Sequence, residues 1–186
     1  MKRTAYSALA LLILLSLPAA AQTKAAGPTV VLETSMGIIK VRLSPDQAPI
    51  TCKNFLDYVR SGFYNGTIVH RVDFVAGLGG YTEALTGKPT GPAIKNESKN
   101  GLKNLRGTLA MARYNDPDSA TSQFFINLRD NPHLDPSGGG YGYAVFARVV
   151  EGMDVVDAIA KVKTGNKGPF YNMPLQTIVV KSARLE

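Results

Sequence analysis

The sequence predicts a mostly β protein that also contains two helices. Short runs rich in β-branched residues recur along the chain, and clusters of Gly, Pro, Asn and Asp separate them. Such runs are typical of strands joined by turns. Two other stretches carry apolar residues at helical spacing. The length of 186 residues fits one domain with a sizeable core, and no internal repeat or second domain is visible.

The chain begins with the features of a secretory signal peptide. Lys2 and Arg3 precede an apolar run over Ala8–Leu17, and Ala19-Ala20-Ala21 forms a small-residue cleavage site. The apolar run is shorter than the roughly 20 residues that span a bilayer, which argues against the alternative of an uncleaved anchor. We therefore predict a signal peptide over 1–21, a flexible lead-in over 22–28 and one domain over 29–186. Export into a bacterial periplasm follows from this prediction and from the resemblance described below.

The distribution of charged and apolar residues argues against nucleic acid and membranes as partners. The formal charge is +7 and falls to +5 once Lys2 and Arg3 are removed. The remaining basic residues are scattered, whereas nucleic-acid binding usually requires a concentrated stripe or a known motif. No further stretch has the length and apolarity of a membrane helix. We therefore expect no nucleic-acid partner and no membrane association after cleavage. We expect a monomer because no long exposed apolar stripe is evident.

The first elements are a hairpin and a helix. Thr29–Thr34 and Ile38–Leu43 are β-branched runs separated by Ser35-Met36-Gly37, which predicts a hairpin with Gly in the turn. Ile50–Arg60 has helical spacing and follows Pro49, a residue that suits the first turn of a helix.

The central part of the chain alternates strands with irregular segments. Thr67–Val72 predicts a strand. The region from Gly77 to Asn104 is rich in Gly, Pro, Lys and Asn, and we interpret it as a long irregular loop; loops of such length are usually functional. Gly107–Ala112 and Gln123–Leu128 predict two further strands, with turn residues between them.

The C-terminal part predicts a strand over Tyr143–Val150, an amphipathic helix over Gly152–Val162 and a closing strand over Thr177–Leu185. Many strands at short spacing with two well-separated helices point to a closed antiparallel barrel whose open ends the helices cover. Spacing alone establishes only the mostly β class with two helices.

The single cysteine, Cys52, lies on the apolar side of the first predicted helix with Phe55 and Val59. One cysteine cannot form an internal disulfide. Free Cys is among the most buried residue types, so we interpret Cys52 as a core residue. One Cys and two His also argue against a zinc site, which usually needs four nitrogen or sulfur ligands.

Two apolar runs carry the polar groups of a candidate site. Ser122-Gln123-Phe124-Phe125-Ile126 contains one amide and two aromatic rings, and Val69-His70-Arg71-Val72 contains a histidine and an arginine. Arg, Gln and Phe on adjacent strands can build a pocket with an apolar floor and a few fixed hydrogen-bond donors. Such a pocket suits a neutral ligand with one carbonyl to orient, and an X-Pro peptide is such a ligand.

Three segments carry a family resemblance: Tyr64 to Val72 (YNGTIVHRV), Asn104 to Arg113 (NLRGTLAMAR) and Ser119 to Ile126 (SATSQFFI). They resemble the cyclophilin family of peptidyl-prolyl cis-trans isomerases, and bacterial exported members most closely. The resemblance runs from about Val30 to Leu185. It implies a closed eight-stranded antiparallel β-barrel capped by two α-helices, and a rotamase activity that needs no cofactor and no metal.

The chemistry of such an enzyme assigns a role to Arg71. Rotation about a peptide bond faces a barrier of about 18–20 kcal/mol because the nitrogen shares its lone pair with the carbonyl. A donor aimed at the prolyl nitrogen favours the twisted, unconjugated state. Arg71 is the candidate catalytic residue, and its guanidinium stays protonated. The alternative for a strand arginine is a surface or ion-paired residue.

The resemblance implies substrate-binding roles for nine further residues. Gln123 would hold the substrate backbone, Phe125 would form the floor of the proline pocket, and Arg113 would act through its backbone. A strand Phe is ordinarily a core residue, and the two roles of Phe125 are compatible. The full set is Phe74, Val75, Ala112, Arg113, Gln123, Phe125, His133, Leu134 and Tyr143. Strand alternation places His70 on the face opposite Arg71, so we expect it to be a structural, hydrogen-bonded core histidine.

The sequence departs from the family pattern after Val72. Two residues are missing before Tyr81, and placing the gap after Asp73 puts Gly77 where the family has a glutamine. That glutamine normally helps to hold the substrate backbone and the arginine, so its loss predicts a slower enzyme. If another group takes its place, Arg113 or the Thr82–Lys95 loop would be the first to consider.

The leading hypothesis is an isomerase that accelerates X-Pro isomerisation during the folding of exported proteins. Its partners would be X-Pro segments of unfolded or folding polypeptides. The altered Asp73–Gly77 stretch motivates an alternative, a chaperone-like module that binds proline segments with weak or no catalysis. A hydrolase is disfavoured because no Gly-x-Ser-x-Gly elbow surrounds a serine.

Overall fold

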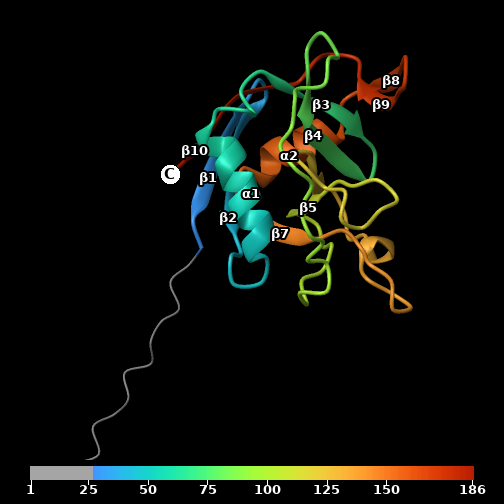
Figure 1. Ribbon diagram of the computed structural model, residues 1–186. Coiled ribbons are helices and arrows are strands. Elements are labelled where there is room, and N and C mark those ends of the chain that lie inside the picture. The colour runs from blue at the N-terminus through green and yellow to red at the C-terminus, as the bar shows by residue number, and fades with distance from the viewer. Residues whose placement is uncertain (1–26) are drawn as a thin grey trace, which may run out of the picture.

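Eight strands close into an antiparallel barrel in the computed structural model, which describes residues 27–186 (Figure 1). Their order around the barrel is β1-β10-β3-β4-β6-β5-β7-β2. The strands are β1 (Thr29–Thr34), β2 (Gly37–Leu43), β3 (Thr67–Val72), β4 (Val75–Thr82), β5 (Thr108–Met111), β6 (Phe124–Asn127), β7 (Val145–Glu151) and β10 (Val179–Leu185). The predicted fold class is confirmed. The predicted signal peptide and most of the lead-in lie outside the described residues.

Two α-helices pack on the barrel, α1 (Pro49–Arg60) and α2 (Met153–Ala160). The first lies against β10 and β7, and the second against β2 and β4 (Figure 1). The ring of Phe55 on α1 lies 5.1 Å from that of Phe146 and 5.2 Å from that of Phe124. All three rings are almost fully buried, so α1 contributes directly to the barrel core.

The predicted N-terminal hairpin and first helix are confirmed at nearly the expected bounds. Strand β1 pairs with β2 so that Thr34 faces Gly37 across a turn of two residues. Gly37 has φ 138°, a conformation that side-chain-bearing residues rarely adopt. Pro49 occupies the first turn of α1, as predicted.

The N-terminus of α1 is capped by a residue far away in the sequence. Ala48 offers no side-chain cap. The Glu97 carboxylate instead accepts hydrogen bonds from the backbone N–H of Ile50 (3.1 Å) and Thr51 (2.8 Å), and from the Thr51 hydroxyl (2.7 Å). This contact fastens the long loop between β4 and β5 to the helix, and it also places a negative charge at the positive end of the helix dipole.

The predicted long loop is wrong at its start, because Gly77 to Thr82 belong to strand β4. Glycine is required there by close neighbours. A Cβ on Gly79, which has φ +87°, would lie 3.0 Å from the Tyr64 ring, and one on Gly80 would lie 2.5 Å from the Gln123 side chain. The glycines that make this segment look like a loop are therefore what allow the strand to fit.

A second hairpin was not predicted at all. Strands β8 (Thr164–Lys167) and β9 (Phe170–Pro174) form a separate two-stranded sheet after α2 (Figure 1). Strand β9 lies beside β3. The Phe170 ring packs edge-on against Tyr81 at 4.8 Å. The hairpin thus extends the wall of the barrel next to Arg71.

Cys52 is buried in the core, as predicted. Burial raises the pKa of its thiol to about 11. A thiol with such a pKa is unreactive at neutral pH, because the thiolate is the nucleophilic form.

Candidate functional site

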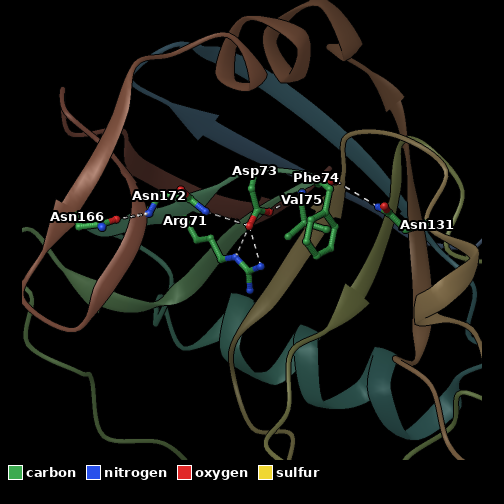
Figure 2. Close-up of polar contacts among 7 residues, drawn as sticks. All are labelled: Arg71, Asp73, Phe74, Val75, Asn131, Asn166 and Asn172. Carbon is green, nitrogen blue, oxygen red and sulfur yellow. Dashed lines mark hydrogen bonds and ion pairs between the residues drawn. The ribbon is translucent and has the colours of Figure 1, made fainter.

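The Arg71 guanidinium at the end of β3 is held by a carboxylate two residues further on. Its Nε donates to Asp73 Oδ2 at 2.8 Å, and Nη2 lies 2.7 Å from the same oxygen (Figure 2). The guanidinium also lies over the Phe74 ring, 5.3 Å from its centroid. Figure 2 shows Arg71 and Phe74 on the same side of the sheet. The positive group is therefore fixed by an ion pair along one edge and an aromatic ring across one face.

Six of the predicted substrate-binding residues gather in one small apolar cluster next to this arginine. We call it the apolar face; it comprises Phe74, Val75, Ala112, Phe125, Leu134 and Tyr143. Phe125 and Val75 form its buried floor, and the other four are partly exposed. The Phe125 ring meets Tyr143 edge-on at 5.6 Å. The floor residue is also core, as expected.

His133 borders the apolar face from the short 3-10 helix η1 (Pro132–Leu134). Its ring lies 5.2 Å from that of Phe74, edge-on. The same helix carries Leu134 into the cluster. The Asn131 side chain, which precedes this helix, donates to the Phe74 carbonyl at 3.2 Å (Figure 2). The end of β3 and the 3-10 helix are thus tied together around the site.

Arg113 lies at the far side of the apolar face, and backbone carbonyls hold its side chain. Its guanidinium lies 4.8 Å from the Tyr143 ring centroid. It donates to four carbonyl oxygens, those of Tyr114, Asn115, Tyr141 and Gly142. These bonds hold the side chain away from Gly77, so Arg113 does not fill the place of the missing glutamine. The backbone next to it is ordered by a bond from Ala112 N to the Gln123 carbonyl at 2.9 Å.

Gln123 lies between two hollows, with its side chain against the backbone of Gly80. One hollow, of about 130 Å³, is lined by Gln123 with Ala112 and Arg113 among others. The other, of about 500 Å³, is lined by Gln123 with His70, Tyr81 and the β8–β9 turn. The amide is therefore accessible to a chain that passes from one hollow to the other.

The structure corrects the prediction for His70. The pairing of β3 with β4 shifts by one residue between Val69 and Arg71, which makes His70 the extra residue of a β-bulge. His70 and Arg71 consequently lie on the same side and line one hollow. Desolvation by burial lowers the pKa of His70 to about 4. Among the described residues no group forms a hydrogen bond with its Nδ1. The expected position on the face opposite Arg71 is therefore wrong, because His70 lines a hollow together with Arg71.

Gly77 is the cross-strand partner of Arg71 and leaves the space beside it without a side chain. A Cβ at this position would lie 3.5 Å from Arg71 Cβ and 3.5 Å from His70 Nε2. Both are ordinary contact distances, so a Cβ atom fits here. The resemblance places a glutamine at this point. In this chain, position 77 of strand β4 has no side chain that could hold Arg71.

Sequence reasoning missed Asp73 and the β8–β9 hairpin as parts of the site. The spacing of Arg71 and Asp73 could have revealed the first, because residues i and i+2 of a strand share a face. No local pattern placed Phe170 or Asn172 beside β3. Among residues 27–186, no cluster of His, Cys, Asp or Glu side chains could hold a metal ion, and no helix is long and apolar enough to cross a bilayer.

The arrangement thus offers a fixed, permanently protonated donor beside an apolar face, with an amide and two hollows flanking them. Such a site can orient and desolvate a neutral group, and it can stabilise a change in bond order without covalent chemistry.

Comparison with known proteins agrees with this geometry. The family model of cyclophilin-type peptidyl-prolyl cis-trans isomerases matches residues 29–185. The chain is 52% identical over 158 residues to peptidyl-prolyl cis-trans isomerase A of Dickeya dadantii, covering 84% of this chain and 83% of that protein. It is 51% identical over 158 residues to peptidyl-prolyl cis-trans isomerase B of Escherichia coli, covering 82% and 96%.

Among solved structures, a cyclophilin-type isomerase from Cryptosporidium parvum superposes with a TM-score of 0.74 at 28% identity, covering 86% of this chain and 97% of that one. The same protein, crystallised in the presence of the dipeptide Ala-Pro, gives a TM-score of 0.73. The fold and the match to the family model define a cyclophilin. The chain belongs to the cyclophilin-type peptidyl-prolyl cis-trans isomerase family, whose members are enzymes that need no cofactor.

Proposed function

We propose that Arg71 and the apolar face form the catalytic site of this isomerase, and that its substrates are X-Pro bonds of proteins folding after export. The observation that carries the proposal is the position of the Arg71 guanidinium, stacked on Phe74 at the border of the apolar face. The proline ring would lie on this face, above Phe125. The relative that was crystallised with Ala-Pro supports the choice of ligand.

The proposed mechanism follows from the electronic structure of the imide. The proline ring stays on the apolar face while the acyl side rotates, and the Gln123 amide holds the substrate backbone. Arg71 Nη1 forms no hydrogen bond with any described residue and is free to donate to the prolyl nitrogen as its lone pair localises. A donor fixed in a partly dry site favours the twisted state over the planar ones, which lowers the barrier.

The test is the substitution Arg71→Ala, measured by NMR exchange or a protease-coupled assay on an X-Pro tetrapeptide. We expect kcat/KM to fall by at least about tenfold, because losing one transition-state donor typically costs on the order of 10²–10³ in rate. Arg129→Ala is the matched control, since its guanidinium also lies near the Phe74 ring, at 5.8 Å, but is exposed and unconnected to Asp73.

Wild-type turnover in the Arg71→Ala protein would refute the assignment of Arg71. If the unmodified protein binds proline peptides without accelerating their isomerisation, the alternative of a proline-segment-binding chaperone-like module replaces the catalytic one.

The proposal includes a periplasmic monomer with a mature chain that starts near Gln22. It rests on the basic start, the short apolar run and the small-residue exit of the first 21 residues. The bacterial relatives at about 50% identity support a bacterial setting. No nucleic acid, membrane or cofactor is part of the proposed function.

A further inference from the structure

The Asp73 carboxylate is engaged from three sides in a manner that ordinary surface aspartates are not. Its Oδ2 accepts Arg71 Nε at 2.8 Å, lies 2.7 Å from Nη2, and accepts Asn172 Nδ2 of strand β9 at 3.4 Å. Its Oδ1 accepts the backbone N–H of Val75 at 3.1 Å, and its own N–H donates to the Val75 carbonyl at 3.0 Å. Figure 2 shows Arg71 and Asn172 converging on the Asp73 carboxylate.

The position of Asp73 explains why it can reach the arginine. Only two residues, Asp73 and Phe74, separate β3 from β4. The bonds to Val75 fix the first of them in a tight connection, so its side chain returns along the strand toward Arg71. Across the sheet, the partner Gly77 offers no side chain. The short β3–β4 connection therefore places the Asp73 carboxylate beside Arg71, where Gly77 of the neighbouring strand has no side chain to pair with it.

We propose that Asp73 is the positioning residue for the catalytic Arg71 and replaces a side chain at position 77 in this task. This inference rests on the proposed role of Arg71. The ion pair is partly exposed, since 47% of the Arg71 side chain and 18% of the Asp73 side chain are accessible, and solvent-screened pairs of this kind contribute little to stability. Its effect is on geometry: it occupies Nε and Nη2 and fixes the guanidinium over the Phe74 ring. Holding a reacting group in place is a large part of enzymatic rate enhancement.

The proposal requires that Asp73 act only through Arg71, and a double-mutant cycle measures this directly. We expect Asp73→Asn to lower kcat/KM by about five- to thirtyfold, mainly through kcat, since a charge-assisted contact that orients the donor is lost. Asn keeps an oxygen that can accept from Val75, so the connection is preserved. In the Arg71→Ala background, the same substitution should change kcat/KM by less than about twofold.

Two further variants sharpen the test. Gly77→Gln places a side chain beside Arg71 at a position where an added Cβ makes only ordinary contacts. It should therefore recover at least half of the activity, on a logarithmic scale, that Asp73→Asn loses. Asp157→Ala is the matched control, because it removes an aspartate that pairs with Arg106 on the outside of α2. We expect this control to retain wild-type kcat/KM.

Each outcome is decisive. An equal loss from Asp73→Asn with and without Arg71 would overturn the proposal and make Asp73 a merely structural residue of the β3–β4 connection. Unchanged activity in Asp73→Asn would overturn it as well. If Asp73→Asn has a lower melting temperature, the comparison is repeated well below that temperature, where the fraction folded is equal. Wild-type activity in Arg71→Ala alone would instead refute the proposed role of Arg71, so the two failures are distinguishable.

Discussion

The Arg71 guanidinium is paired with Asp73 and lies over the Phe74 ring. An ion-paired strand arginine was the alternative to a catalytic one, and the structure shows that Arg71 is ion-paired beside the candidate site. The two descriptions are compatible, because a guanidinium has five donor hydrogens and Asp73 occupies only one edge. The remaining edge is available to a substrate.

His70 gives a prediction at the same scale. Its pKa is about 4 in the folded protein, against 6.5 for an unperturbed histidine. Between these values the unfolded chain binds more protons, so the free energy of unfolding decreases as the pH falls through this window. We expect a loss of about 2 kcal/mol between pH 7 and pH 5. Urea denaturation at a series of pH values measures it.

The chain has two histidines, so His133 serves as the matched control for His70. His70→Gln should remove most of the pH dependence in this window, whereas His133→Gln at the exposed edge of the site should keep it. An unchanged slope in His70→Gln would contradict the assignment. The neutral imidazole also implies that activity does not require a protonated His70 at pH 7.

At the scale of the element, strand β4 is decisive for the site. It carries Val75 into the apolar face and places Gly77 opposite Arg71, while Gly80 forms the surface on which Gln123 lies. Three glycines in six residues weaken any strand signal, because glycine has no side chain to pack. In this barrel, however, the small size is needed against Tyr64 and Gln123.

Gly80→Ala tests this account of β4. An added Cβ would lie 2.5 Å from Gln123 Cγ, and the flexible glutamine must move away. We expect kcat/KM to fall by about threefold or more, since one substrate-holding group is displaced, with a loss of about 1 kcal/mol in unfolding free energy. Enzyme assays and thermal denaturation on the same samples separate the two effects.

Gly87→Ala is the control, because the nearest atom to its added Cβ would be 3.7 Å away on the Tyr81 ring. It should leave kcat/KM unchanged. If Gly80→Ala lowers activity as much in a Gln123→Ala background as in the wild type, the effect does not act through Gln123 and this interpretation of β4 is wrong.

At the scale of the whole molecule, closure of the barrel brings the site together. Arg71, Gln123 and Tyr143 belong to distant parts of the chain. Arg71 lies in β3, Gln123 directly precedes β6 and Tyr143 precedes β7, and the order β3-β4-β6-β5-β7 makes these strands near neighbours. The β8–β9 hairpin then adds a wall outside the barrel, where it reaches His70 and Asp73. Closed pairing also leaves no free edge on the barrel that could recruit another chain.

The prediction at this scale concerns the mature chain. We expect the protein purified from its native host to begin near Gln22 and to sediment as a monomer, because the first 21 residues have the order of a signal peptide. Intact-mass spectrometry of the envelope and cytosolic fractions decides the first point. A cytosolic protein that retains Met1 or Lys2 would contradict export, and a stable dimer at micromolar concentration would contradict the monomer.

The sequence by itself determined the mostly β class, the first hairpin and both helices. These features depend on local patterns: β-branched runs, helical spacing and a Pro–helix start are properties of a few adjacent residues. The long motifs then proposed one site for Arg71, Gln123 and Phe125. In the structure Phe125 lies in the apolar face, and Gln123 lines a hollow together with His70.

Only the tertiary structure decided the bulge at His70, the assignment of β4 as a strand, the β8–β9 hairpin and the ion pair between Asp73 and Arg71. Each depends on a partner that the local sequence does not contain. A bulge is defined only by the pairing with the opposing strand. The glycines of β4 are explained only by the side chains of Tyr64 and Gln123, which pack closely against them. The partner of Arg71 depended on the length of the β3–β4 connection, which became visible only when the two strands were paired.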